Sequence, residues 1–195
     1  MAFDPNTNSN VQTGRFRVGG YAFAAPLAAP DPADGVAELD AAYLNMGYLS
    51  KDGLEEAEQR DTSDHEDVNG DVVETTQDKY GLTLTVTFLE SLRGDLLKEI
   101  HGPENVTIVA PTQAKEGTIT VKRNSVELPE RKWVFELASR KARTRKFAPK
   151  ARIVSTGSQK FVSTDLISYQ ATIKCYPNAA GDSLINLITT PKKSA

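Results

Sequence analysis

Apolar and polar residues alternate most regularly between positions 80 and 90. Every second position is apolar and the positions between carry threonine, in the order Leu82, Thr83, Leu84, Thr85, Val86, Thr87 and Phe88. An alternation of this kind, rich in β-branched side chains, predicts a strand with one buried face. Because that face needs a second layer to cover it, the strand is predicted to lie in the core of a domain.

The period changes to that of a helix directly after this strand. Behind a candidate N-cap at Ser91, apolar residues recur three and four positions apart: Leu92, Leu96, Leu97 and Ile100. A stop signal follows at 101–103, where the sequence reads His-Gly-Pro. We therefore predict one short helix over about 91–100, flanking the sheet.

Other stretches have the composition of strands. They are residues 17–24, 43–50, 54–60, 106–110, 118–123, 132–139, 166–176 and 184–189. Asp52-Gly53 is predicted to be the hairpin turn between the second and third of them. The sequence thus predicts a single helix and many strands. The predicted fold is mainly β (α+β): an antiparallel β-sandwich or barrel with one short flanking helix, long loops and extended termini.

The length of 195 residues suits one domain. We place it at 17–182. Residues 1–16 have no periodicity and are predicted to be a flexible N-terminal arm or a segment ordered by a partner, and 183–195 a C-terminal arm. Residues 25–42, rich in Ala, Pro, Asp and Gly, form a loop so long that we expect it to be disordered or to bind something. The sequence shows no early apolar run of the kind that would indicate a signal peptide or a membrane span, so neither is expected.

Charge is distributed unevenly along the chain, although the formal net charge is only -3. Residues 52–78 hold eleven acids against one base, Arg60, and include a predicted acidic loop at 61–79. Residues 131–152 hold nine bases against one acid, Glu136. The two segments therefore carry opposite charge, and each needs a partner or full solvation.

Candidate catalytic residues are few. A nucleophile needs a base within reach, most often histidine, and the chain has only His65 and His101. Residues 181–184 read Gly-Asp-Ser-Leu, the tetrapeptide of a family of lipases and esterases, but no histidine follows Ser183. Cys175 lies within an apolar strand face and is predicted to be a small core residue. We expect no enzyme activity and no cofactor.

A calcium loop is the one metal site that the sequence suggests. Asp67, Asn69 and Asp71 place oxygen atoms at the first, third and fifth positions of such a loop, with Asp78 at the twelfth. Val72 stands where that loop has glycine, and Asp78 is shorter than the usual glutamate. Incidental acidity is the favoured interpretation, and no metal is expected.

The basic run at 131–152 has three interpretations: a solvated face, a nucleic-acid-binding surface, or an interface between copies of the chain. Nucleic-acid binding would use interleaved aromatic residues, but Trp133 and Phe135 suit a buried strand face. Contact between unlike patches on two copies builds rings if it closes and filaments if it does not. Exposed ion pairs are worth only about 0–1 kcal/mol each, so strand addition at sheet edges would have to provide affinity.

Six segments, in this order, resemble the major tail protein of long-tailed, non-contractile bacteriophages of actinobacterial hosts. They lie at 18–26, 39–53, 70–73, 83–90, 127–136 and 169–177. The resemblance implies a β-sandwich or barrel with a flanking helix, six copies in a ring, and stacked rings that form a tail tube through which DNA passes. It also implies location in the virion tail after synthesis in the host cytoplasm, with tape-measure, tail-terminator and tail-tip proteins as partners and no membrane.

Charge and composition suggest which residues would serve such a tube. Predicted subunit contacts are Ala25, Pro26, Leu27, Pro30, Arg140, Lys141, Arg143, Arg145, Lys146, Asp61, Asp64 and Asp67. Predicted lumen residues are Glu55, Glu56, Glu58, Thr83, Thr85 and Thr87. Unpaired bases would grip the phosphates of passing DNA, so bases in 140–152 are expected to lie outside or to be paired. The alternative functions are a nucleic-acid-binding β-domain that uses 131–152 and, more distantly, a hydrolase that uses Ser183.

Overall fold

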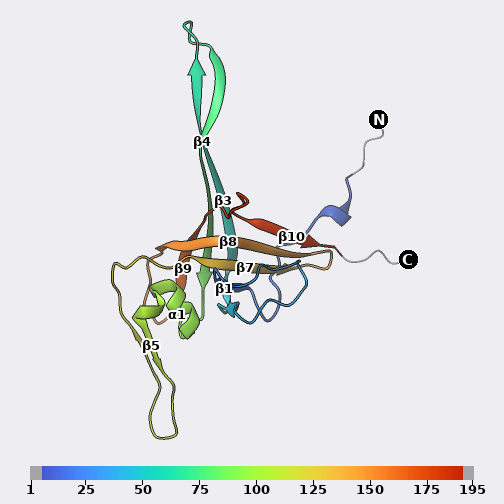
Figure 1. Ribbon diagram of the computed structural model, residues 1–195. Helices are drawn as coiled ribbons and strands as arrows, with labels where there is room; N and C mark the ends of the chain where they lie inside the picture. Colours follow the sequence, from blue (N-terminus) through green and yellow to red (C-terminus); the bar gives the residue numbers. More distant parts are fainter. Residues whose placement is uncertain (1–5, 191–195) are drawn as a thin grey trace, which may run out of the picture.

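The computed structural model describes residues 6–190, which form ten strands, one α-helix and two 3-10 turns (Figure 1). The strands are β1 (Ala22–Pro26), β2 (Leu44–Asn45), β3 (Leu49–Glu66), β4 (Val72–Phe88), β5 (Val106–Val109), β6 (Thr118–Val121), β7 (Arg131–Ala138), β8 (Arg143–Thr156), β9 (Tyr169–Cys175) and β10 (Ile185–Thr189). The helix α1 spans Gly94–His101, and the 3-10 turns span Asn8–Asn10 and Pro103–Asn105. The predicted mainly β fold, with antiparallel sheets and one short helix, is confirmed.

One eight-stranded antiparallel sheet forms the body of the protein. Its order is β2-β1-β7-β8-β9-β4-β3, with β10 also paired to β8. The edge strands β2 and β3 are consecutive in the chain, and residues 46–48 between them can span at most about 14 Å. The amide of Met46 donates to the carbonyl of Ala22 (2.8 Å), and that of Leu89 to the carbonyl of Tyr48 (2.9 Å). The sheet therefore curls until its two edges meet.

The main core lies inside the curled sheet. The apolar side chains of β4, from Leu82 to Phe88, are buried and the threonines between them are half-buried, which confirms the predicted alternation. The rings of Phe88 and Trp133 are 6.2 Å apart, although β4 and β7 are not neighbours in the sheet. The two halves of the sheet thus face each other as the layers of a sandwich.

Helix α1 covers one end of this core. Leu96, Leu97 and Ile100 are buried, as the helical period predicts. The helix begins at Gly94, however, and no side chain caps it, so the predicted cap at Ser91 is wrong. Leu92 precedes the helix and is 81% exposed. At eight residues, α1 is the one α-helix in the described chain and is too short to cross a membrane.

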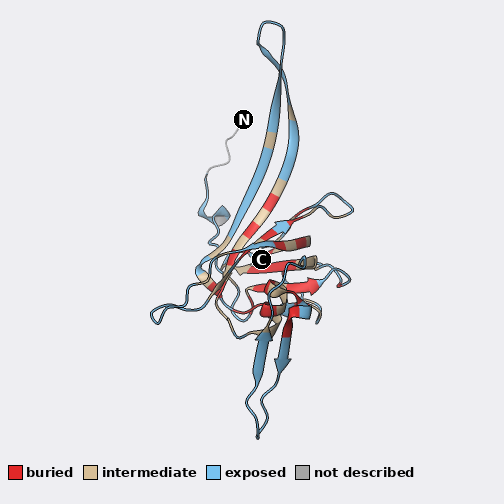
Figure 2. Cartoon of the chain, turned by 90° about the vertical axis from the view of Figure 1, so that its left-hand side faces the viewer, coloured by how far each residue is buried: buried red, intermediate tan, exposed pale blue. Residues whose placement is uncertain are grey.

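A second, smaller core lies on the other face of β7 and β8. It consists of Ala25, Ala29, Tyr43, Val134 and Phe147. The long segment after β1 covers these residues, so that β7 and β8 are buried on both faces, and Figure 2 shows buried positions concentrated in this part of the body. The segment was expected to be disordered or partner-bound; instead part of it packs on its own chain, where Ala25 and Ala29 are buried together with Tyr43, which follows the segment, while most of its other residues are exposed.

Strand β8 was missed in the sequence. It runs through the centre of the sheet, with β10 beside residues 143–147 and β9 beside residues 151–156. Pro149 lies where β8 has one residue more than β7, between positions paired to Trp133 and Arg131. A proline is tolerated at such a bulge because no ladder hydrogen bond is needed there.

Two hairpins project from the body in opposite directions (Figures 1 and 2). The β5–β6 hairpin leaves beside α1. The much longer β3–β4 hairpin turns at 67–70, and Gly53 lies at an irregularity in the pairing between Leu49 and Leu54. The predicted hairpin turn at Asp52-Gly53 is therefore wrong, and residues 61–79, predicted to be an acidic loop, form the outer part of this hairpin.

The predicted arms are partly built into the sheet. In the predicted arm at 1–16, the carbonyl of Arg15 accepts from the amide of Ala138 at the end of β7 (2.6 Å); Arg17, at the start of the predicted domain, donates from its amide to the carbonyl of Glu136 (3.0 Å). Within 183–195, residues 185–189 form β10. The remaining parts of the arm predictions, at 1–5 and 191–195, lie outside the described residues.

Candidate assembly surfaces

Residues 58–80 of the β3–β4 hairpin, called the outer hairpin, extend beyond the core. In this stretch β3 pairs only with β4, and β9 pairs with β4 only from Leu82 onward. Nearly all of its residues are exposed, as the upper part of Figure 2 shows. A two-stranded ribbon without a third strand or a covering layer is marginally stable in water. The outer hairpin is therefore exposed within its own chain to the degree expected of a segment that needs another surface to cover it.

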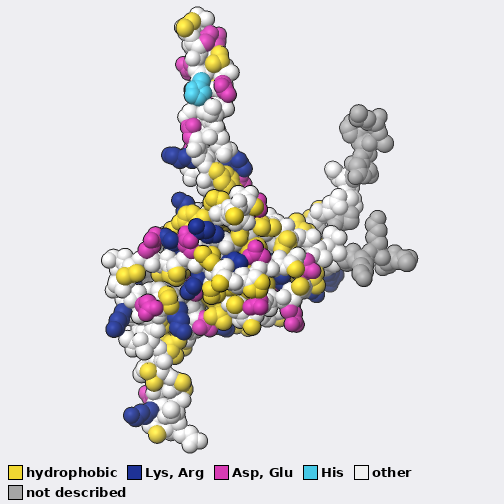
Figure 3. Space-filling model, viewed as in Figure 1, with side chains coloured by type: hydrophobic (Ala, Val, Ile, Leu, Met, Phe, Trp, Pro, Cys, Tyr) yellow, Lys and Arg dark blue, Asp and Glu magenta, His cyan; other side chains and the backbone are white. Residues whose placement is uncertain are grey.

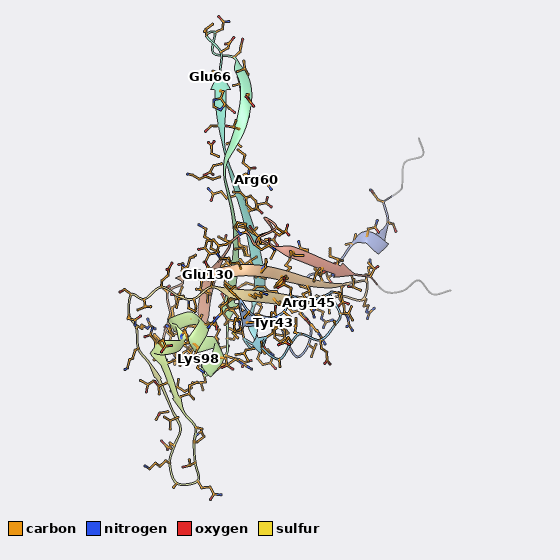
Figure 4. All side chains as sticks on the ribbon, viewed as in Figure 1. Tyr43, Arg60, Glu66, Lys98, Glu130 and Arg145 are labelled. Carbon is orange, nitrogen blue, oxygen red and sulfur yellow. The ribbon has the colours of Figure 1, made fainter. Side chains whose placement is uncertain are left out.

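The outer hairpin is strongly acidic. It carries eight acids against two bases (Figure 3). Both bases are already paired, Arg60 to Glu58 and Lys79 to Asp61 at 3.7 Å. The remaining acids include Glu66, which Figure 4 labels near the tip. Three of the hairpin's eight carboxylates have neither an ion pair nor a hydrogen bond to any of residues 6–190: those of Glu66, Asp71 and Glu74.

The tip of the hairpin is held by its own backbone. Asp67 Oδ1 accepts hydrogen bonds from the amides of Asn69 (2.8 Å) and Asp71 (3.0 Å). These backbone donors hold the pKa of Asp67 below its usual value. Gly70 takes a φ of 87°, which closes the turn. The carboxylate proposed as the first calcium ligand therefore stabilises the turn.

The predicted lumen residues divide into two groups. Thr83, Thr85 and Thr87 lie on the outer face of the sheet, and Glu55 shares this face because it pairs with Thr85. Pairing with β9 extends the face through Gln170, Thr172 and Lys174. The result is a polar surface of short, mostly uncharged side chains.

The other two predicted lumen residues lie elsewhere. Glu56 pairs with Lys146 across the sheet, with 2.5 Å between Oε2 and Nζ, and Glu58 pairs with Arg60 on the outer hairpin. Lys146 was predicted to lie at a subunit contact, and this ion pair gives it a partner within its own chain.

Most of the basic run is neutralised inside the chain. Six of its nine bases form ion pairs: Arg131 with Glu99, Lys132 with Asp31, Arg145 with Glu136, Lys146 with Glu56, Lys150 with Glu130, and Arg152 with Glu127 and Glu130. Burial raises the pKa of Glu99 even though Arg131 lies beside it. The basic segment and the acidic outer hairpin therefore do not neutralise each other within one chain.

Arg145 is the most deeply buried of these bases, at 1% side-chain exposure. Its Nη2 lies 2.5 Å from Oε1 of Glu136, whose other oxygen pairs with Arg17 at 2.7 Å. The guanidinium also donates to the carbonyls of Asp34 (2.6 Å) and Ala37 (2.7 Å). Arg145 was predicted to lie at a subunit contact, but its donors tie the segment after β1 to the sheet (Figure 4).

Three bases remain at the turn between β7 and β8: Arg140, Lys141 and Arg143. This turn, residues 139–143, is called the basic turn. Lys141 donates to the carbonyl of Asn8, and the three side chains have no acidic partner among residues 6–190. A groove of about 410 Å³ adjoins the turn, lined also by Val36, Thr189 and Thr190. Val36, Thr189 and Thr190 are distant in sequence from the basic run, so no local pattern in the sequence could have placed them beside it.

The segment at 25–30, also predicted to make subunit contacts, is mixed. Ala25 is buried in the second core, whereas Pro26 and Pro30 are exposed and Leu27 is 42% exposed. Lys132 Nζ anchors the segment, 2.5 Å from both the carbonyl of Ala29 and Oδ1 of Asp31. Only the exposed residues of this segment are available to a partner.

The candidate catalytic residues come from three separate elements. His65 lies on the outer hairpin, with Nε2 3.1 Å from Oγ1 of Thr76; His101 ends α1; and Ser183, which is buried, precedes β10. No hydrogen bond links these three in the described chain. Burial and, secondly, Arg123 lower the pKa of His101, which opposes the cation-stabilising effect of the helix end. Burial raises the pKa of Cys175 to about 12, as suits the predicted core residue.

Comparison with known proteins gives weak likenesses only. No family model matches the chain. No curated protein matches it either. Among solved structures, the sheath/tube terminator of an extracellular contractile injection system, PVC, in the extended state, is similar at a TM-score of 0.43 and 12% identity, covering 87% of this chain and 94% of that chain. The tube terminating cap of the anti-feeding prophage is similar at a TM-score of 0.42 and 12% identity, covering 94% and 98%. At this level the likenesses do not establish a function.

Proposed function

We propose that the chain is a structural subunit that assembles with copies of itself into hexameric rings, and that stacked rings form a phage tail tube through which genomic double-stranded DNA passes. This is the function that the sequence resemblance implies. Tape-measure, tail-terminator and tail-tip proteins are the further partners that follow from it. The observation that carries the proposal is the outer hairpin, a long ribbon that leaves the core and has no covering layer of its own.

The physical argument concerns what such a ribbon needs. Ordering each residue of a chain costs about 1–2 kcal/mol of backbone entropy, which buried surface normally offsets. The outer hairpin buries little, yet it exposes Val68, Val72 and Val73. A second copy of the chain that covers these valines would supply the missing burial. Self-assembly therefore explains how the outer hairpin can be ordered although its own chain does not bury it.

Open strand edges offer a source of affinity. The outer edge of β3 has no neighbouring strand along its 18 residues in the described chain. An unpaired edge accepts another strand through backbone hydrogen bonds, and β3 contains no proline; irregularities at 49–54, 61–62 and 65–66 confine regular pairing to the stretches between them. We propose that edge pairing between copies holds the ring together.

The threonine face suits a DNA channel. Thr83, Thr85 and Thr87, with Thr172 and Gln170, present neutral groups, while Glu55 and Lys174 carry opposite charges. Each unpaired base in a lumen would add salt-dependent affinity for phosphate. We propose that this face lines the lumen, because Lys174 is the one base among these residues and their other side chains are neutral or acidic and would not hold the phosphates of passing DNA.

Nucleic-acid binding through residues 131–152 is less well supported. Six of the nine bases already pair with acids of the same chain, and Trp133 and Phe135 are fully buried. Arg140, Lys141 and Arg143 keep their charge, but the aromatic rings of the segment are buried and cannot stack on bases.

Electron microscopy of the purified chain tests the proposal directly. We expect rings or hollow tubes from the native chain. A variant in which Asn-Gly replaces residues 61–79 joins Arg60 to Tyr80, which are paired in the native hairpin, and should remain folded but unassembled. The matched control replaces residues 110–117 of the β5–β6 hairpin with Asn-Gly, which joins the paired residues Val109 and Thr118. A native chain that is monomeric at all concentrations, or one that retains duplex DNA at physiological salt without assembling, would contradict the proposal.

A further inference from the structure

Two surfaces keep their charge after every ion pair within the described chain is counted. One is the acidic outer hairpin, where Glu66, Asp71 and Glu74 have no partner. The other is the basic turn, with three bases in four positions. Other bases without an acidic partner include Lys115, Lys160 and the adjacent pair Lys122 and Arg123, which lie away from the basic turn. The outer hairpin and the basic turn each hold three charges of one sign that no ion pair in the described chain neutralises.

These two surfaces do not meet within one chain. The outer hairpin points away from the body, and the basic turn lies on the body, where Arg143 pairs with Thr189 at the end of β10 (Figure 1). Asp34, close in sequence to Val36 in the groove beside the turn, forms no ion pair with the three bases. Its Oδ1 instead accepts from the amides of Ala37 (2.6 Å) and Val36 (2.7 Å), which lowers its pKa.

The two surfaces also match in their apolar parts. Exposed ion pairs contribute little affinity, so charge alone would not hold the contact. The groove beside the basic turn offers Val36 and Ala142, and the outer hairpin exposes Val72, which shares a strand face with Glu74 two residues further on. Burying Val72 in the groove would add affinity. Each surface thus combines apolar side chains with charges of one sign.

We propose that the outer hairpin of one copy docks on the basic turn of a second copy, with its free acids facing Arg140 and Arg143 and Val72 in the groove. This proposal rests on the proposed function and names the surfaces that the contact uses. Because two different patches of the same chain meet, the contact is heterologous: it propagates from copy to copy and closes into a ring or continues as a filament. The charges set the register and the encounter rate, and Val72 adds affinity.

Charge reversal in two separate variants tests the contact. The turn variant carries Arg140→Glu, Lys141→Glu and Arg143→Glu, and the hairpin variant carries Glu66→Lys, Asp71→Lys and Glu74→Lys. In each variant alone, like charges would face each other across the contact. Sedimentation velocity should therefore show that each variant assembles only at a protein concentration at least about tenfold higher than the native chain needs. When the two are mixed, every hairpin meets a turn of opposite sign in an alternating assembly. The mixture should therefore assemble as the native chain does.

A matched control reverses three exposed bases elsewhere, Lys115, Lys122 and Lys160. It should assemble alone like the native chain, and circular dichroism should show all variants folded, since surface substitutions change stability little. Assembly of the turn variant at native concentrations overturns the contact, as does a mixture that stays unassembled or a control that fails as completely as the turn variant. If the native chain assembles and these results occur, only this contact is wrong; a native chain that never assembles removes the proposed function as well.

Discussion

The inner and outer halves of the β3–β4 hairpin have the same backbone pairing and opposite surroundings. From Leu82 to Phe88, β4 has neighbours on both sides and one face in the core. From Val72 to Tyr80 it has one neighbour and no buried side chain. Strand pairing therefore continues well past the point where burial ends. The inner half is stabilised by its own chain, whereas the outer half lacks that support and, as we propose, obtains it from a second copy.

The largest expected difference concerns the buried ion pair beside the core. Glu136→Ala leaves Arg145 buried without its partner, which should reduce the free energy of unfolding by about 3–5 kcal/mol. The matched change in the outer hairpin, Glu74→Ala, should alter it by about 0.5 kcal/mol or less. Urea denaturation followed by circular dichroism measures both. Equal effects would contradict the division into a stabilised body and an unsupported hairpin.

Two glycines with nearly the same backbone conformation give a smaller contrast. Gly47 has a φ of 88° and closes the sheet between β2 and β3; Gly70 has a φ of 87° at the hairpin tip. A Cβ on Gly47 would lie 2.4 Å from Cδ of Glu90, and one on Gly70 would contact nothing within 4 Å.

Gly47→Ala should therefore lower the free energy of unfolding by about 1–3 kcal/mol, from strain and the displacement of Glu90. Gly70→Ala carries the same strain of a positive φ, about 1–2 kcal/mol, but displaces no neighbouring atom, so its loss should be the smaller of the two. Thermal unfolding of both variants compares them. A larger loss from Gly70→Ala would mean that the hairpin tip supports the body, which would contradict the separation between the two halves.

The smallest effect concerns pH at the place where the sheet closes. Glu90 accepts from Nε of Arg93 (2.6 Å) and from the amide of Tyr48 (2.9 Å), and the bond from Arg93 is the main cause of its lowered pKa. A folded pKa below the unfolded value means that this contribution is fully present above the unfolded pKa, about 4.3, and is lost as pH falls through the folded pKa.

Glu90→Gln should remove this part of the acid sensitivity. The free energy of unfolding of the variant, measured from pH 6 down to pH 2, should fall less steeply than that of the native chain. Identical slopes would show that Glu90 does not help to close the sheet.

The sequence predicted the elements in which local pattern and final environment agree. The alternation at 82–88 identified β4, and the short β-branched stretches identified β5, β6, β7 and β9 within a few residues. Strand β8 was missed because its buried positions include Arg145, whose charge hides the alternation, and because Pro149 interrupts it. The segment after β1 was misjudged because proline and alanine resemble a free loop, although Ala29 and Tyr43 are buried.

The site was predictable only in part, because charge along a sequence does not show which charges are already paired. Asp-Gly at 52–53 suggested a turn, so the hairpin was expected to end early and its acidic half was interpreted as a loop. The basic run looked uniform, yet contacts with distant acids such as Glu99 and Glu136 neutralise most of it. Which bases remain free depends on the fold, and only the structure separates Arg140 and Arg143 from Arg145.

Hydrogen exchange of the backbone amides in the outer hairpin tests the central claim most directly. In the isolated chain, amides at 58–66 and 72–80 should exchange rapidly, while those at 82–88 are protected by the core. After assembly, exchange in the outer hairpin should slow by about 100-fold or more, with the body unchanged. Strong protection of the outer hairpin in the monomer, or no change on assembly, would contradict the claim that a second copy covers it.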